Sequence, residues 1–128
     1  MRALRALSAV AIVAGLILVP AFAAHGHTAT YPTEVTLNTR DIGEGKVRFY
    51  GRLRSTKAAC EAHSKVKLAE VNTGLWVRTE TDADGKYAFV EVLPTGDWHV
   101  RVQAKVLRSD ALHDHRCEAS TSTTVHVS

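Results

Sequence analysis

The sequence contains none of the short motifs that most often mark an enzyme. It has no Gly-x-Ser-x-Gly nucleophile turn, no His-Glu-x-x-His zinc motif and no glycine-rich phosphate-binding loop. No pair of carboxylates lies in a segment expected to form a cleft. These absences argue against the commonest hydrolytic and nucleotide-dependent chemistries. We therefore expect a protein that is not an enzyme and that carries no cofactor.

The chain also has little excess charge. It carries 16 Lys and Arg against 13 Asp and Glu, a net charge of +3, and Arg2 and Arg5 belong to the N-terminal segment described next. Without that segment the net charge is +1. Lys57, Lys65 and Lys67 form a basic stretch, but acidic residues are interleaved with them, which indicates a solvated surface. A nucleic-acid or anionic-membrane partner would call for a clustered basic face, so we expect neither.

A long apolar run occurs only at the N-terminus. Two arginines precede an apolar run over residues 6–19, and a proline ends that run just before Ala21-Phe22-Ala23. The run is shorter than the ~20 residues that a membrane-spanning helix needs, which makes an uncleaved anchor the weaker alternative. A basic start, a short apolar run and small residues at the end are typical of a secretory signal peptide. We predict a signal peptide at residues 1–23, with Ala23 or Ala24 as the last residue removed.

The remaining residues are expected outside the cytoplasmic membrane. No Cys follows the apolar run, so the sequence offers no lipid attachment site there. We predict a secreted, extracellular protein, periplasmic if the source has an outer membrane, that is monomeric and does not contact the membrane. Residues 24–33 are predicted to be a flexible segment, and residues 34–128 are long enough for one domain.

The predicted domain contains only two cysteines, Cys60 and Cys117. In an oxidising compartment a disulfide between them is the default expectation. A reactive thiol pair would favour close Cys-x-x-Cys spacing, which these residues lack. We therefore predict a single disulfide between Cys60 and Cys117.

Short segments of alternating apolar and polar residues fill the domain. Trp98, Val100 and Val102, for example, alternate with polar residues. Seven segments are predicted to be strands: residues 34–39, 47–53, 65–71, 75–81, 86–92, 97–106 and 117–127. One stretch, residues 58–69, is compatible with a short helix that carries Cys60. The pattern predicts an all-β fold, a single prealbumin-like or Ig-like β-sandwich of about seven strands.

Two turn signals separate the strands in the middle of the chain. Asp84-Gly85 tolerates the positive φ values of a two-residue hairpin turn, and Leu93-Pro94-Thr95-Gly96 indicates a second turn. We therefore expect the three strands around these turns to form an antiparallel meander whose register depends on Asp84-Gly85. A calcium loop beginning at Asp82 is the alternative, but its position 12 would be Leu93 rather than the required Glu.

The turn and core residues of this region resemble a known family. The segments concerned are Gly51-Arg52-Leu53, Val66-Lys67-Leu68, Thr81-Asp82-Ala83-Asp84-Gly85-Lys86-Tyr87-Ala88-Phe89 and Leu93-Pro94-Thr95-Gly96-Asp97-Trp98-His99-Val100-Arg101-Val102. Over residues 46–106 the sequence resembles the carboxypeptidase regulatory-like domains, which are transthyretin-like (prealbumin-like) β-sandwiches similar to the B-type repeats of collagen adhesins. The resemblance implies a non-catalytic accessory or interaction module.

The histidines suggest an alternative in which the protein binds a metal ion. Cleavage after Ala24 would start the chain at His25-Gly26-His27, and a free amine with two imidazoles can chelate Cu(II). This start resembles the mature ends of periplasmic copper-carrier sandwiches and of copper-dependent polysaccharide monooxygenases. His113 and His115 are expected in a loop. Our leading expectation is no metal, with copper at His25 and His27 as the alternative.

Exposed aromatic residues suggest carbohydrate binding. Trp98 shares its parity with core residues and is expected to be buried, whereas Trp76 and Tyr50 share theirs with charged residues. Trp76 and Tyr50 are therefore the candidate ligand-binding residues. The leading functional prediction is a secreted non-enzymatic structural or interaction domain with a protein or cell-surface glycan partner. A carbohydrate-binding module is the first alternative, and copper binding is the second.

Overall fold

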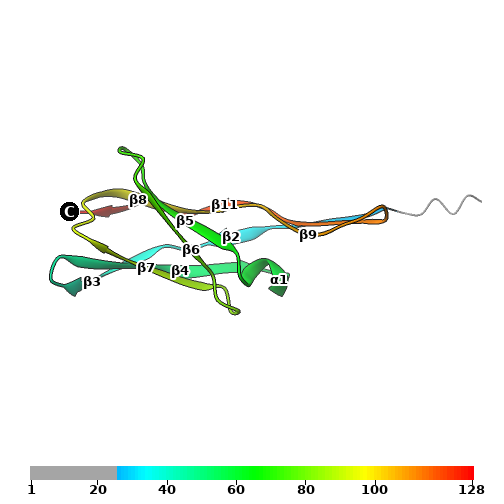
Figure 1. Ribbon diagram of the computed structural model, residues 1–128, viewed down its shortest axis with the longest axis horizontal. Coiled ribbons are helices and arrows are strands. Elements are labelled where there is room, and N and C mark those ends of the chain that lie inside the picture. Colours follow the sequence, from blue (N-terminus) through cyan, green and yellow to red (C-terminus); the bar gives the residue numbers. More distant parts are fainter. Residues whose placement is uncertain (1–25) are drawn as a thin grey trace, which may run out of the picture.

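The structure, a computed structural model, describes residues 26–128 and is all-β (Figure 1). Strands take up 62% of it and helix 4%. The strands are β1 (His27–Tyr31), β2 (Thr33–Val35), β3 (Asn38–Gly43), β4 (Lys46–Ser55), β5 (Lys65–Glu70), β6 (Trp76–Glu80), β7 (Lys86–Val92), β8 (Gly96–Val102), β9 (Lys105–Ser109), β10 (His113–Cys117), β11 (Ser120–Thr121) and β12 (Val125–Val127), and the helix is α1 (Ala58–Glu61). The predicted all-β fold with one disulfide is confirmed. The signal peptide predicted at residues 1–23 lies outside the described residues.

Two sheets form the body of the molecule. In the first, β4 is central, with β2 and β3 along one edge and β7 along the other. In the second, β5 lies between β6 and β8, and the far edge of β8 pairs with β11 and β12. β6 and β7 are edge strands, because each pairs with only one other strand within residues 26–128.

Apolar side chains from the inner faces of the two sheets make the core. Phe49 and Leu53 of β4 and Val66 and Leu68 of β5 are completely buried. The Phe49 ring contacts Trp98, with the ring centroids 5.4 Å apart. Because side chains alternate along a strand, the burial of these residues also fixes which residues point outward.

A third sheet, β1-β10-β9, extends beyond the sandwich as an arm (Figure 1). β1 runs parallel to β10, whereas β9 is antiparallel to it. The sequence analysis did not predict this arm. Residues 27–31, expected to be flexible, form β1, and residues 113–117, expected in part to be a loop, form β10.

The arm also explains why two predicted strands are interrupted. Alternation continues beyond Val102, but Val106 is 55% exposed because the chain leaves the core after β8 and enters β9. The strand predicted over residues 117–127 is likewise divided into the end of β10, then β11 and β12. Alternation predicted strands correctly but did not show where they leave the core.

The predicted meander is wrong, because consecutive strands lie in different sheets. β6 pairs with β5, β7 pairs with β4, and β8 returns to pair with β5. The segment around Asp84-Gly85 is therefore a crossing between sheets and not a hairpin. Its turn chemistry was predicted correctly in part: Gly85 has φ +82°, but Asp84 does not have a positive φ.

Asp82 organises this crossing. Its carboxylate accepts hydrogen bonds from the backbone amides of Asp84 and Lys86, at 2.8 and 3.0 Å. These hydrogen bonds, that from Lys86 foremost, lower the pKa of Asp82, and the charges of Lys86 and Arg52 add to the effect. The Gly85 carbonyl accepts a hydrogen bond from the Leu53 amide at 2.8 Å, which holds the crossing against β4.

The predicted disulfide is confirmed. Cys60 in α1 and Cys117 at the end of β10 are bonded, with their Cα atoms 5.6 Å apart. Both residues are buried. The bridge therefore attaches the base of the arm to the helix that follows β4.

We expect the Cys60→Ser, Cys117→Ser double variant to lose about 4 kcal/mol of unfolding free energy, the chain-entropy value for the loop that the bridge closes. Denaturant unfolding of the variant and of the oxidised wild type measures the difference. Reduced wild type is the control and should match the variant. A loss below about 1 kcal/mol would show that the unfolded chain gains little freedom when the bridge is absent.

The Gly85→Ala variant tests the crossing. A Cβ atom at Gly85 would lie 2.4 Å from the Leu53 carbonyl oxygen, so the backbone must shift. Gly43→Ala is the matched control, because Gly43 also has a positive φ (+87°) but open space around it. Urea unfolding should show a loss of ~1–2 kcal/mol for Gly43→Ala, from the φ angle alone, and a larger loss for Gly85→Ala. Equal losses would contradict the proposed contact with Leu53.

Candidate functional site

A row of three cations crosses the outer face of the β11-β8-β5-β6 sheet. Lys67 of β5 lies directly opposite Arg78 of β6 on one side and Arg101 of β8 on the other. Neighbouring strands lie about 4.8 Å apart, and like charges placed directly opposite one another are destabilising. Within residues 26–128, none of the three forms an ion pair with an acidic side chain. In the described residues, no ion pair therefore offsets the repulsion within the row.

Trp76 lies beside this row on β6, and its side chain is exposed, as predicted. The Lys67 ammonium is 4.9 Å from the centroid of the indole, and the Arg78 guanidinium carbon is 4.8 Å from it. Such cation–π contacts hold the ring and the two cations together. Trp98, by contrast, is buried, and its indole nitrogen donates a hydrogen bond to the Pro94 carbonyl at 2.9 Å.

Tyr50, the other predicted ligand-binding residue, lies on the outer face of the opposite sheet. It is half-buried on β4, and the Arg48 guanidinium carbon lies 5.3 Å from the centroid of its ring. Arg52 and Lys86 on the same face lie near the Asp82 carboxylate. The structure therefore does not bring Trp76 and Tyr50 into one site, and on the face of Tyr50 the cations Arg52 and Lys86 have an acidic neighbour.

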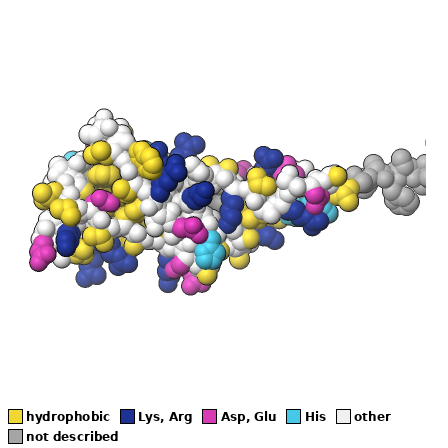
Figure 2. Space-filling view, in the orientation of Figure 1, with side chains coloured by type: hydrophobic (Ala, Val, Ile, Leu, Met, Phe, Trp, Pro, Cys, Tyr) yellow, Lys and Arg dark blue, Asp and Glu magenta, His cyan; other side chains and the backbone are white. Residues whose placement is uncertain are grey.

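An apolar groove of about 270 Å³ opens beside Trp76, between the edges of β6 and β7. Its exposed apolar side chains include Leu75, Val92 and Leu93, the last 74% exposed. Figure 2 shows hydrophobic side chains gathered over the end of the sandwich that is far from the arm. The groove extends the surface of Trp76 with apolar contact area.

One buried carboxylate, Glu70, supports the loops around this groove. It accepts hydrogen bonds from the backbone amides of Asn72, Thr73 and Asp97. Hydrogen bonding to Thr73 is the largest influence, and together these bonds lower the pKa of Glu70 to about 2 against the opposing effect of burial. The charged form of Glu70 therefore stabilises the fold.

Three histidines cluster on the arm. His27 of β1 is paired in register with His113 of β10, and His115 follows two residues later on the same face. The Nδ1 atom of His27 lies 2.9 Å from the Nε2 atom of His115. The ring centroids of His27 and His115 are 4.9 Å apart, whereas His113 lies 6.3 Å from His27 and 5.8 Å from His115.

The environment of His115 lowers the pKa of its imidazole. Desolvation is the main cause of its lowered pKa, followed by the charges that His27, His113, Lys57 and Arg108 carry or can acquire. His25, the other histidine of the predicted copper site, lies outside the described residues. As they stand in residues 26–128, no three His, Cys, Asp or Glu side chains are already arranged to hold a metal ion.

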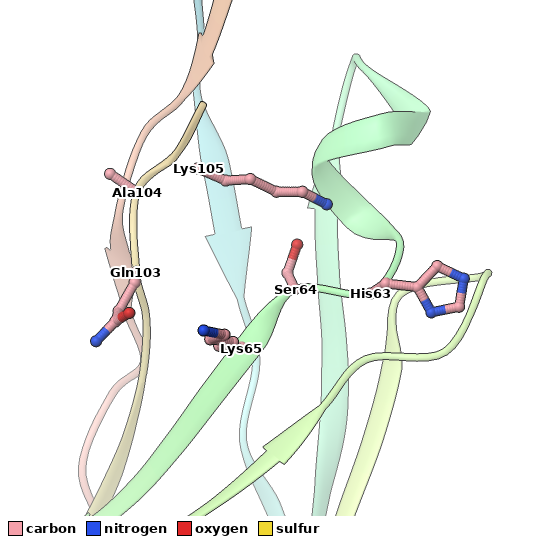
Figure 3. A pocket seen from close by; sticks show the side chains of 6 residues that line it. All are labelled: His63, Ser64, Lys65, Gln103, Ala104 and Lys105. Carbon is pink, nitrogen blue, oxygen red and sulfur yellow. The ribbon is translucent and has the colours of Figure 1, made fainter. Parts of the chain in front are cut away.

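A second hollow, of about 240 Å³, lies next to α1, and a serine, two lysines and a histidine are among the residues that line it (Figure 3). Lys105 donates hydrogen bonds to the carbonyls of Ala59 and Ala62, at 3.0 and 2.7 Å. The Ser64 hydroxyl donates to the Cys60 carbonyl at 2.8 Å, and His63 points away from both. These polar groups support the helix that carries Cys60.

Trp76 was predicted from the sequence as a candidate binding residue, but the cation row beside it and the histidine cluster on the arm were not. Lys67 was assigned to a solvated surface because acidic residues are interleaved with the lysines around it. Arg78 and Arg101 are distant in sequence, and only the strand register places them beside Lys67. His27 was considered with His25 rather than with β10. Strand parity was the available signal in both cases, but parity does not give the pairing partner.

Comparisons of this sequence with models of protein families, with curated proteins and with solved structures found no match. In the part of the chain that the structure describes, no helix is long and apolar enough to cross a membrane.

We expect Glu70→Gln to lower the melting temperature at pH 7, because an amide cannot accept all the hydrogen bonds that the carboxylate accepts. The folded-state pKa of Glu70 is about 2, below its ordinary value of 4.5. Its contribution is therefore complete above pH 4.5 and declines as the pH falls from 4.5 through 2.

Thermal unfolding of both proteins from pH 7 to pH 2 measures this contribution. The difference in melting temperature should shrink with acidification. Asp82 and Asp110 also have lowered pKa values, so both proteins should retain some acid sensitivity. A difference that stays constant across this range would contradict the role of the Glu70 charge.

Proposed function

We propose that this chain is a secreted, non-enzymatic binding domain whose ligand is an anionic polysaccharide at a cell surface. Two features support the setting: the disulfide suits an oxidising compartment, and the sequence resembles carboxypeptidase regulatory-like interaction modules. The observation that carries the proposal is the row of Lys67, Arg78 and Arg101, which has no acidic partner in residues 26–128 and lies beside the exposed Trp76.

The row suits a single chain of carboxylate or sulfate groups. In the part of the chain that the structure describes, no carboxylate is paired with these cations, so an anionic ligand relieves their mutual repulsion as it binds. The cationic band is one row wide, because neither neighbouring row consists of cations. On one side of the row Lys65 lies opposite Glu80, and on the other side Ala69 lies opposite Trp76. A narrow band fits one saccharide chain crossing the strands better than the two phosphate backbones of a duplex.

Trp76 supplies the contact that distinguishes a sugar from a simple anion. An exposed indole offers a flat apolar surface to the C–H face of a pyranose ring. Contacts with Lys67 and Arg78 hold the indole in place, which lowers the entropy lost on binding. The apolar groove alongside accommodates the less polar parts of a neighbouring residue.

Each contact is weak, so affinity depends on repetition. An exposed ion pair contributes about 0–1 kcal/mol and is screened by salt. A polymer presents many equivalent anions, which raises the effective concentration at the row. We therefore expect binding that weakens with salt and that is stronger for polymers than for short fragments.

Polygalacturonate binding tests the proposal. Affinity electrophoresis and calorimetry should show binding by the wild type that weakens about tenfold in Trp76→Ala, and about tenfold again in the Lys67→Gln, Arg78→Gln double variant. The uncharged polymer dextran should not bind. Salt should weaken binding of the wild type more than binding of the double variant.

The opposite sheet supplies a matched control. Arg40 and Arg48 also lie directly opposite one another, and Arg48 contacts Tyr50. The Arg40→Gln, Arg48→Gln double variant removes the same charge and should bind as wild type does. Loss of binding in this control but not in Trp76→Ala would move the site to Tyr50. Absence of polyanion binding by the wild type would reject the glycan and favour a protein partner.

A further inference from the structure

The histidine cluster on the arm lies away from the Trp76 face and plays no part in the function proposed above. We propose that His27, His113 and His115 together bind one divalent transition-metal ion of the kind that imidazole prefers, such as Zn²⁺ or Cu²⁺. The site joins β1 to β10 through three neutral nitrogen ligands and leaves a coordination position for water or a further ligand.

The spacing of His27 and His115 already fits a shared ion. Metal–imidazole bonds of about 2.0–2.1 Å place two ligand nitrogens roughly 2.9–3.4 Å apart, depending on the coordination angle. The observed distance between Nδ1 of His27 and Nε2 of His115 is 2.9 Å. Their ring centroids, 4.9 Å apart, also agree with the ~5 Å expected for rings on one ion. A metal ion replaces the proton that these two nitrogens share.

His113 completes the set after a small movement. Its ring centroid is 5.8 Å from His115 and 6.3 Å from His27, about 1 Å farther than rings on one tetrahedral ion. This excess explains why the three side chains are not already arranged to hold an ion. The backbone is in place, because His27 and His113 are register partners and His115 is on the same face. Rotation of one half-buried side chain is enough to close the site.

Asp110 prepares His113 for this role. Its Oδ1 atom lies 3.2 Å from the Nδ1 atom of His113 and accepts hydrogen bonds from the backbone amides of Leu112 and His113. Histidines that bind metals commonly donate their second ring N–H to a carboxylate, which fixes the tautomer and orients the ring. Here that arrangement leaves Nε2 of His113 free for the ion.

The ion would act as a cross-link on the arm. β1 is the outer strand of the arm and pairs only with β10 among the strands described. A ligand from β1 and two from β10 hold this parallel pair together, in addition to the disulfide at the end of β10. Metal binding therefore raises the stability of the arm by mass action.

Calorimetric titration of the EDTA-treated full-length protein with ZnCl₂, and separately with CuCl₂, tests the site. We expect one ion per chain, with Cu²⁺ bound more tightly than Zn²⁺. His113→Ala and His115→Ala should each weaken binding at least 100-fold, and Asp110→Asn should weaken it about 10–100-fold. Zinc should raise the melting temperature of the wild type and leave that of His115→Ala unchanged.

Two variants outside the cluster are matched controls. His63 and His126 each lie against a carboxylate, that of Glu80 and that of Asp97, and are more exposed than His113. The His63→Ala and His126→Ala variants each remove an imidazole outside the cluster and should bind metal as wild type does. Circular dichroism without metal shows whether each variant folds. Wild-type binding by His115→Ala, or binding weaker than millimolar by the wild type, would overturn the proposal. Loss in His25→Ala alone would also overturn it, because it would place the ion at the N-terminal segment.

Discussion

Burial between the two sheets determines which side chains of their strands face outward. Val66 and Leu68 of β5 are completely buried, so Lys67 must point outward. The same requirement on β8, where Val100 and Val102 are buried, turns Arg101 to the outer surface. Antiparallel pairing then sets these cations opposite one another. A register shift of one residue would remove the core and the cation row together, so the surface site is as strongly specified as the core.

The arm depends on a different constraint. Among the described strands no second sheet covers its outer strands, and Val106 on β9 remains exposed. What holds the arm to the body is the junction at α1, where Cys60 bonds to Cys117 and Lys105 donates hydrogen bonds to the carbonyls of Ala59 and Ala62. A four-residue helix with little stability of its own thus becomes the attachment point of a whole sheet.

The strands and their inner faces follow from local sequence patterns and were predicted correctly. The partner of each strand does not follow from these patterns, and there the prediction was wrong. The alternation of apolar and polar residues around Phe89 and Val100 correctly identified two strands and their inner faces. The disulfide was predicted correctly because the predicted domain contains only two cysteines. The meander was wrong because a turn such as Asp84-Gly85 reports backbone geometry and carries no information about which strand lies alongside. The arm was missed because β1 and β10 are polar, so periodicity in the sequence gave little sign of a buried face. For the candidate sites, Trp76 and His27 were identified singly, but their neighbours come from distant segments.

Glu70 adds a consequence for the groove beside Trp76. Its carboxylate holds the residues after β5 on one side and the start of β8 on the other, through the amides of Asn72, Thr73 and Asp97. Both segments are thus tied to one charged group, in addition to the hydrogen bond that the Val71 amide donates to the Asp97 carbonyl at 2.8 Å. A proton on Glu70 would weaken its hydrogen bonds to both segments at the same time, so the loops beside the groove share one acid-sensitive support.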